Sequence, residues 1–131
     1  MWNHYEMNGK IYLIDSVILI DHLNGIIEAT NWLKKNTPSI SVISVITRAE
    51  ILVGTSKSDM LSIKTWLDSF ECISISKEIA DLAAICRNKY GLKLPDSFQT
   101  AIALKYKLQL VTRNTKDFKN NMEFVKIPYE I

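Results

Sequence analysis

LKLPDSFQTAIALKYKLQLVTRNTKDF, residues 92–118, decides the fold because it joins a predicted helix directly to a predicted strand. The helix is expected to start at Asp96, behind Pro95, and to reach about residue 107. The apolar run 109–112 is expected to form a buried strand, and Asp117 closes the turn that follows it. A helix that leads into a short apolar strand is typical of α/β proteins.

The same alternation of strands and helices runs outward from this stretch. Runs rich in β-branched residues predict strands at 10–14, 40–43, 72–75, 109–112 and 124–127. Helices are predicted at about 16–25, 26–35, 44–53, 60–70 and 77–90, with Ser16 and Ser44 as candidate N-caps. Short strands separated by helices favour parallel pairing through right-handed crossovers. The expected fold is a three-layer α/β/α domain with a central, mainly parallel sheet of four to five strands.

The composition is that of one soluble globular domain: 131 residues, 47% apolar and 23% charged. We expect residues 1–131 to form it, with the unpatterned residues 1–9 as a loose extension. A net charge of +2 is too small for a strongly basic nucleic-acid binder. The apolar run 11–20 contains Asp15 and is shorter than the about 20 residues that cross a bilayer, so no membrane contact is expected. Cys72 and Cys86 have no metal-ligand spacing and are expected to be core residues in a reducing cytoplasm.

Four acids stand where such a fold would bring them together: Asp15, Glu50, Asp96 and Asp117. Asp15 ends a predicted strand and Asp117 follows another, so both belong at the edge formed by the carboxyl ends of the strands. Asp96 opens a helix, whose N-terminus tolerates an anion, and Glu50 lies on a helix that follows a strand. Taken singly, each acid also has an ordinary explanation as a cap, a turn residue or a surface charge.

A cluster of carboxylates predicts a cation. Carboxylates a few ångströms apart repel one another, so at neutral pH they need protons or a positive ion. Hard divalent ions with oxygen ligands, Mg²⁺ or Mn²⁺, are the natural occupants. The pattern therefore indicates metal-assisted chemistry on phosphate esters. With only four glycines, the chain has no glycine-rich loop to cradle phosphates.

The acid-bearing segments YLIDSVILIDHL (12–23), SVITRAEILVG (44–54) and 92–118 resemble, in this order, the PIN-domain family and in particular its small VapC-type ribonuclease toxins. The resemblance extends from about residue 11 to the C-terminal end. It implies that the four acids bind one or two Mg²⁺ or Mn²⁺ ions. It also implies an endoribonuclease that leaves 5′-phosphate and 3′-hydroxyl ends on RNA, and a small antitoxin protein that blocks the site. A homodimer is expected as well.

One position departs from the family pattern, which usually has Asn two residues after the first acid. This chain has Val17, which can neither orient Asp15 nor reach a metal. The alternative function is therefore a catalytically impaired PIN-fold domain that binds RNA or protein. A receiver-like signalling domain also groups acids at strand ends, but it needs a Lys after a late strand, where this chain has Thr112 and Arg113.

Further residues receive lesser roles. Thr112, Asn114 and Ser16 are expected around the acids, although turn chemistry and capping also explain them. Basic side chains that could hold the RNA backbone are Arg48, Arg87, Lys93, Arg113 and Lys116. Asp21 should not share the site, because it is turned about 240° from Asp15 around a helix, and a solvated or capping role is expected. Core packing is the favoured role of Trp32, Trp66 and Phe70, with an antitoxin or dimer interface as the alternative.

Overall fold

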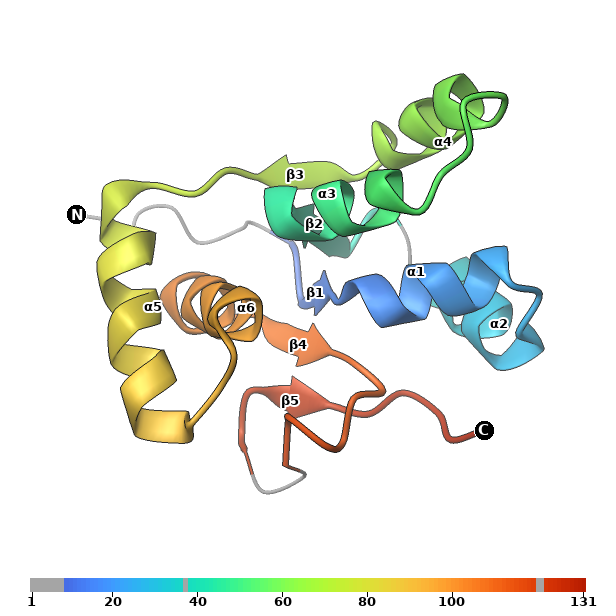
Figure 1. Cartoon of the computed structure of the whole chain (residues 1–131). Helices are drawn as coiled ribbons and strands as arrows, with labels where there is room; N and C mark the ends of the chain where they lie inside the picture. The colour runs from blue at the N-terminus through green and yellow to red at the C-terminus, as the bar shows by residue number, and fades with distance from the viewer. Residues whose placement is uncertain (1–8, 37, 120–121) are drawn as a thin grey trace.

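A sheet of five parallel strands organises the computed structural model, which describes residues 9–36, 38–119 and 122–131 (Figure 1). The strands are β1 (Tyr12–Ile14), β2 (Ser41–Ser44), β3 (Glu71–Ile73), β4 (Gln109–Val111) and β5 (Val125–Lys126). Their order across the sheet is β3-β2-β1-β4-β5, and each neighbouring pair is parallel. The prediction of a mainly parallel sheet of four to five strands is confirmed.

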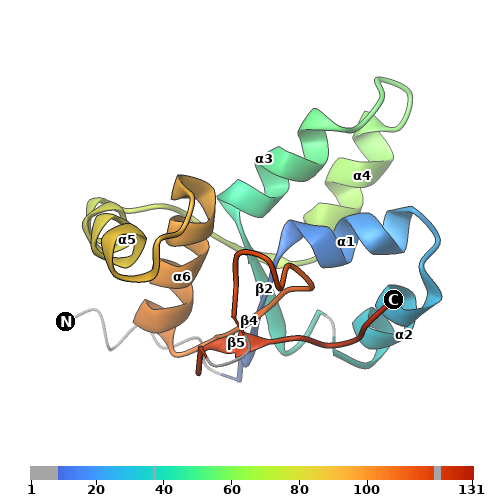
Figure 2. The same cartoon turned by 60° about the horizontal axis from the view of Figure 1, so that its bottom comes forward.

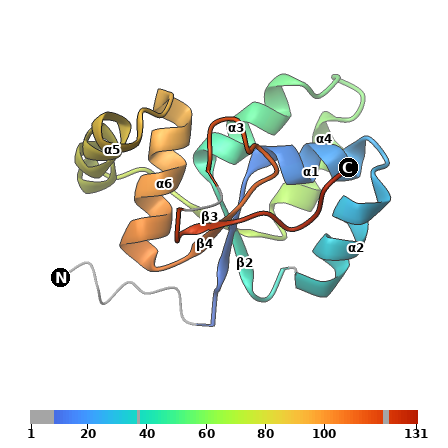
Figure 3. The same ribbon diagram turned by 90° about the horizontal axis from the view of Figure 1, so that it is seen from below.

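Six helices within the described residues cover the two faces of this sheet. They are α1 (Ser16–Leu23), α2 (Ile27–Asn36), α3 (Val45–Val53), α4 (Met60–Leu67), α5 (Lys77–Tyr90) and α6 (Leu94–Tyr106). Helices α5 and α6 pack on one face, and α1 to α4 lie on the opposite side, as the turned views show (Figures 2 and 3). The predicted three-layer architecture is confirmed.

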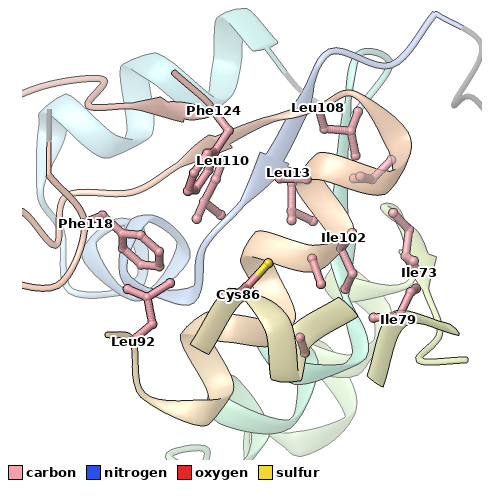
Figure 4. Packing of buried hydrophobic residues seen from close by; sticks show 14 residues of the cluster. Leu13, Ile73, Ile79, Cys86, Leu92, Ile102, Leu108, Leu110, Phe118 and Phe124 are labelled. Carbon is pink, nitrogen blue, oxygen red and sulfur yellow. The ribbon is translucent and has the colours of Figure 1, made fainter. Parts of the chain in front are cut away.

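The core consists of two apolar layers, one on each face of the sheet. Leu13 and Leu110 enter the layer beneath α5 and α6 (Figure 4), whereas their neighbours Ile14 and Val111 enter the opposite layer. Successive side chains of a strand point to opposite faces, and both faces are covered here. This double burial explains why the central strands contain consecutive apolar pairs, Leu13–Ile14, Val42–Ile43 and Leu110–Val111, rather than apolar residues that alternate with polar ones.

Some predicted ends and caps of helices are wrong. Helix α6 begins at Leu94 with Lys93 at its N-cap, so Asp96 lies inside the first turn rather than at its start. The reason is the proline, which occupies one of the first helical positions, where its missing N–H costs nothing. Helix α1 is capped by Asp15, whose side chain accepts from the backbone N–H of Ser16. Ser16 is therefore its first helical residue and not its cap.

The prediction for one cysteine is also wrong. Cys86 is buried as expected, whereas Cys72 is exposed. Cys72 lies on β3, which is the edge strand of the sheet and therefore has a neighbouring strand on one side only.

The predicted helix 60–70 is shorter than expected. It ends at Leu67, and Phe70 packs into the core beyond its end.

The strand order reverses between β1 and β4. The chain first places β2 and β3 on one side of β1, and the crossover through α5 and α6 then places β4 on the other side. Such a reversal leaves a crevice outside the carboxyl ends of the strands. Asp15 directly follows β1 and Thr112 directly follows β4, so both lie at this crevice.

Two expectations concern the limits of the chain. Residues 1–8, which make up nearly all of the predicted loose extension, lie outside the described residues. Along the described residues, no helix combines the length and the apolar character needed to cross a membrane.

Candidate active site

A cleft of ≈ 360 Å³ opens where the strand order reverses. It is lined by Asp15, Ser16, Val17, Glu50, Asp96, Arg113, Asn114, Thr115 and Lys116. Its walls therefore come from the starts of α1 and α6, from α3 and from the loop after β4. Three of the four predicted acids line it directly. A larger cavity of ≈ 700 Å³ lies elsewhere, beside Tyr90 and Phe124.

Asp15 is the most deeply buried of the four acids, with 7% of its surface exposed. Its Oδ1 accepts a hydrogen bond from the Ser16 amide at 2.9 Å, and its Oδ2 accepts one from the Thr112 hydroxyl at 2.7 Å. Burial raises the pKa of Asp15, while these donors and the Gln99 amide, 3.5 Å from Oδ1, lower it. The predicted supporting residue Thr112 thus contacts Asp15 directly.

Glu50 is joined to the start of α1 by a side-chain hydrogen bond. The Ser16 hydroxyl donates to its Oε1 at 3.0 Å, so Ser16 supports Asp15 through its amide and Glu50 through its side chain. Burial raises the pKa of Glu50, and the negative charge of Asp15 adds to the rise. The charge of Asp15 therefore affects the ionisation of Glu50, although the two residues are 35 positions apart in the chain.

Asp96 is influenced by all three other acids. Its pKa is raised to about 6, first by burial and then by the charges of Asp15, Asp117 and Glu50, with Lys93 acting in the opposite direction. Like charges that disfavour ionisation of a neighbour must lie close to it. Asp15, Glu50 and Asp96 line one cleft, and Asp117 lies near enough to raise the pKa of Asp96.

Asp117 lies beside the cleft and is held by its own turn. The Asn114 amide donates to its Oδ2 at 2.8 Å, and its backbone N–H donates to Asn114 Oδ1 at 3.3 Å. Asn114 is fixed in turn through its backbone N–H, which donates to Thr112 Oγ1 at 3.1 Å. Lys93 Nζ approaches Asp117 to 4.0 Å across the turn. The turn thus connects Asp117 to Asp15 through Thr112.

The five basic residues predicted near the acids do not form one patch. Arg113 and Lys116 line the cleft, and Lys93 lies next to Asp117. Arg48 pairs instead with Asp68 at 2.8 Å, and Arg87 donates to the Leu92 carbonyl at 2.8 Å. Neither of these two arginines lines the cleft.

Asp21 has neither the solvated nor the capping role that the sequence predicted. It is buried, with 5% of its surface exposed, and the Arg113 Nε and Nη2 donate to its two oxygens at 2.7 and 2.8 Å. The Tyr129 hydroxyl adds a third bond at 2.8 Å. Rotation around α1 turns Asp21 away from Asp15, as expected, but towards the loop after β4. The two Arg113 bonds leave that guanidinium largely neutralised.

Sequence reasoning missed two residues beneath the acids, Gln99 and Thr47. Both are fully or almost fully buried, and the Gln99 amide donates to Thr47 Oγ1 at 2.8 Å. Gln99 lies three residues after Asp96, and Thr47 lies three residues before Glu50. Residues three apart share a helix face. A polar residue three positions from an acid was therefore the sequence signal that could have predicted Gln99 and Thr47 as neighbours of the acids.

The donor atoms of this cleft suit a hard divalent cation. The acids supply only carboxylate oxygens, which Mg²⁺ and Mn²⁺ prefer. Asp15 has about four lone-pair positions and accepts three hydrogen bonds, so it keeps capacity for one further ligand bond. Among the described residues, no three His, Cys, Asp or Glu side chains already converge as metal ligands would.

The fold and the acidic cleft define an α/β protein of the class that places several carboxylates at the carboxyl-end edge of a parallel sheet. The sequence matches the PIN domain family over residues 12–122. The chain therefore belongs to the PIN domain family, and this prediction is confirmed.

Relatives agree on the type within that family. Ribonuclease VapC10 of Mycobacterium tuberculosis is 31% identical over an alignment of 127 positions that covers 91% of this chain and 93% of that protein. A chain of a toxin–antitoxin complex from Klebsiella pneumoniae is 40% identical, with a TM-score of 0.84 over 92% of this chain and 99% of that one. FitAcB from Neisseria gonorrhoeae, at 19% identity and a TM-score of 0.74 over 92% of this chain and 100% of that one, shares the fold. The predicted VapC type is confirmed.

The raised pKa of Asp96 predicts a pH-dependent stability. Since its pKa rises from 3.8 to about 6, the folded chain keeps a proton that the unfolded chain has released between these values. Stability therefore falls as pH rises through this window. Asp96→Asn should match the parent near pH 3.5 and exceed it at pH 7 by about 1–2 kcal/mol, a value that allows for solvent screening. Urea unfolding in chelator across this range measures the difference, and a difference independent of pH would contradict the prediction.

Proposed function

We propose that this chain is a divalent-metal-dependent endoribonuclease and the toxin of a toxin–antitoxin pair. The observation that carries the proposal is the cleft at the strand reversal, where Asp15, Glu50 and Asp117 all raise the pKa of Asp96. Two comparisons support it, since one relative is named a ribonuclease and one similar structure is a toxin–antitoxin complex. Such a protein would act in the cytoplasm.

The four acids have distinct proposed roles. Asp15 and Asp96 would hold the ion directly, while Glu50 and Asp117 would bind through water or at a second ion. When bound, Mg²⁺ or Mn²⁺ supplies a water of lowered pKa and neutralises charge on the phosphate. Without the ion, the carboxylates would repel the RNA backbone.

Neighbouring residues would orient the acids and the substrate. The Thr112 hydroxyl donates to Asp15, and the Ser16 hydroxyl donates to Glu50. The Asn114 amide donates to Asp117, so each of these three acids is held by a hydrogen-bond donor. Lys116 at the cleft and Lys93 beside Asp117 are the proposed contacts with RNA phosphates. Arg113 is a weaker candidate because Asp21 already engages it.

The proposal predicts a strict requirement for a divalent ion. Purified protein incubated with total RNA and Mg²⁺ or Mn²⁺ should produce fragments with 5′-phosphate and 3′-hydroxyl ends. An excess of chelator should abolish this cleavage, because the acids alone supply no water activated for attack. Gel analysis of the RNA and end-labelling of the products measure both results. Equal cleavage in chelator would sink the metal-dependent mechanism.

The second candidate function is a catalytically impaired binding domain with the same fold. Val17 favours it, because this valine places an apolar side chain in the wall of the cleft. Titration with Mn²⁺ separates the two candidates. A rise in melting temperature favours the nuclease, whereas RNA binding without any response to Mn²⁺ favours the binding domain.

Exposed apolar side chains on the first four helices support an antitoxin partner. Val53 at the end of α3 is 88% exposed, Leu61 on α4 is 79% exposed, and Ile27 on α2 is 61% exposed. Large apolar side chains left in water are stabilised when a partner covers them, although Ile85 on α5 is as exposed as Ile27. Trp32, Trp66 and Phe70 belong instead to the core layer on that side, as the sequence predicted. Homodimerisation is also proposed, with the mass in solution as its test.

A further inference from the structure

A buried polar network lies beneath the acids and is centred on Gln99. The side chain of Gln99 is 1% exposed, and its partners Ser44 and Thr47 are fully buried. Ser44 Oγ donates to Gln99 Oε1 at 2.7 Å, and Gln99 Nε2 donates to Thr47 Oγ1 at 2.8 Å. The same nitrogen lies 3.5 Å from Asp15 Oδ1. A polar group buried this deeply is costly unless its partners are in place.

The hydrogen-bond directions in this network allow one orientation of the Gln99 amide. Thr47 Oγ1 donates to the Ile14 carbonyl at 3.3 Å, so towards Gln99 it can only accept. Ser44 Oγ accepts from the Thr47 backbone N–H at 3.2 Å, so its own hydrogen is available to Gln99 Oε1. The NH₂ group must therefore face Thr47, and its second hydrogen is directed at Asp15.

The network also links the acid-bearing faces of helices α3 and α6. Asp96 and Gln99 lie three apart on α6, and Thr47 and Glu50 lie three apart on α3. Each pair shares one face of its helix, so each acid has a buried residue of the network on its own face. The bond between Gln99 and Thr47 thus joins the two helices beneath Asp96 and Glu50, while Gln99 also reaches Asp15 on the third element.

We infer that Gln99 is a positioning residue, which holds Asp15 in place relative to Asp96 on α6 and Glu50 on α3 for the binding of divalent metal. This inference rests on the proposed function. Gln99 itself touches neither the ion nor RNA, because it is buried below the cleft. It acts through the oxygen of Asp15 and through the Thr47 hydroxyl.

Gln99→Met is the direct test, because methionine has a similar volume and cannot donate to Asp15. The affinity of the folded protein for Mn²⁺, measured by calorimetry, is expected to fall about 10- to 100-fold, as when other partners that orient a metal ligand are lost. At saturating Mn²⁺ the kcat for RNA cleavage is expected to fall, while the KM for RNA stays unchanged. A lower kcat with an unchanged KM is expected when an acid of the site is misplaced, whereas the loss of an RNA contact would raise KM.

Ser97→Ala is the matched control. Ser97 is also fully buried on α6, but its hydroxyl donates only within the helix, to the Lys93 carbonyl at 2.9 Å. This variant should lose stability and keep the Mn²⁺ affinity of the parent.

If Gln99→Met does not fold, Thr47→Val replaces it as the test, because valine removes the oxygen that accepts the hydrogen bond from the Gln99 amide. The Mn²⁺ affinity of Thr47→Val should then fall in the same direction by a smaller factor.

The outcomes separate this inference from the proposed function. Unchanged Mn²⁺ affinity in folded Gln99→Met, or in Thr47→Val where that variant replaces it, overturns the role of Gln99 while the parent still binds and cleaves. A parent protein that binds no Mn²⁺ overturns the metal-dependent function and this inference together. Equal loss of affinity in Ser97→Ala also overturns the inference, because the effect would then follow from weaker packing of α6.

Discussion

Asp15→Asn is expected to reduce RNA cleavage more than about 100-fold, because losing partners that merely orient a metal ligand already costs about 10- to 100-fold. Asp15 is the acid that the chain fixes most firmly, with donors from Ser16, Thr112 and Gln99. Asparagine keeps the shape and can still cap α1, but it removes the negative charge that binds the cation. Cleavage of total RNA in Mg²⁺ measures the loss.

The fold should survive this change, which makes the result specific. Burial raises the pKa of Asp15, so its charge is unfavourable in the metal-free protein, and Asn should leave the melting temperature equal or higher. Asp81→Asn, at an exposed position on α5, is the control and should cleave like the parent. Full activity of Asp15→Asn would remove Asp15 from the proposed site.

Asp21→Asn is expected to lower the free energy of unfolding by about 2–3 kcal/mol, less than the about 3–5 kcal/mol of a fully buried ion pair. The reduction follows from the partial exposure of Arg113, whose side chain is 32% exposed against 7% for Asp21. The Arg113 bonds lower the pKa of Asp21 below 3.8, so the contribution is complete at neutral pH and is lost as pH falls through the lowered pKa. Urea unfolding at pH 7 measures the cost.

A double variant identifies the cause of this loss. Asp21→Asn leaves the Arg113 guanidinium without its charged partner, so adding Arg113→Met should recover part of the stability. A loss below about 0.5 kcal/mol in Asp21→Asn, the size of an ordinary surface substitution, would show that the pair contributes little.

The fold followed from local patterns in the sequence because both faces of the sheet are covered. The central strands β1, β2 and β4 then each contain consecutive apolar residues, and the helices between the strands favour parallel pairing. Helix ends were less predictable: Pro95 was placed before α6, although a proline fits equally well inside a first turn. Cys72 was misjudged because its exposure depends on the position of β3 at the sheet edge, which only the strand order reveals.

The acids of the site could be located because parallel strands bring their carboxyl ends to one edge. What the sequence does not contain is the pairing of side chains far apart in the chain. Arg113 was a candidate for RNA, but Asp21, 92 residues away, engages it. Gln99 was not among the predicted site residues, because its partner Asp15 is 84 residues away in the chain. Such contacts depend on the rotation of whole helices against each other.

The neighbouring positions of β1 and β4 affect how the protein is made. Asp15 meets its donor Thr112 across 97 residues, so the acidic quartet cannot assemble while the polypeptide still emerging from the ribosome lacks the segment through Asp117. Pairing over such separations is also slow to form. A nascent chain that has not yet reached Asp117 therefore lacks one of the four acids, so the proposed cleavage of RNA has to wait until the segments on both sides of β1 have been made and have folded.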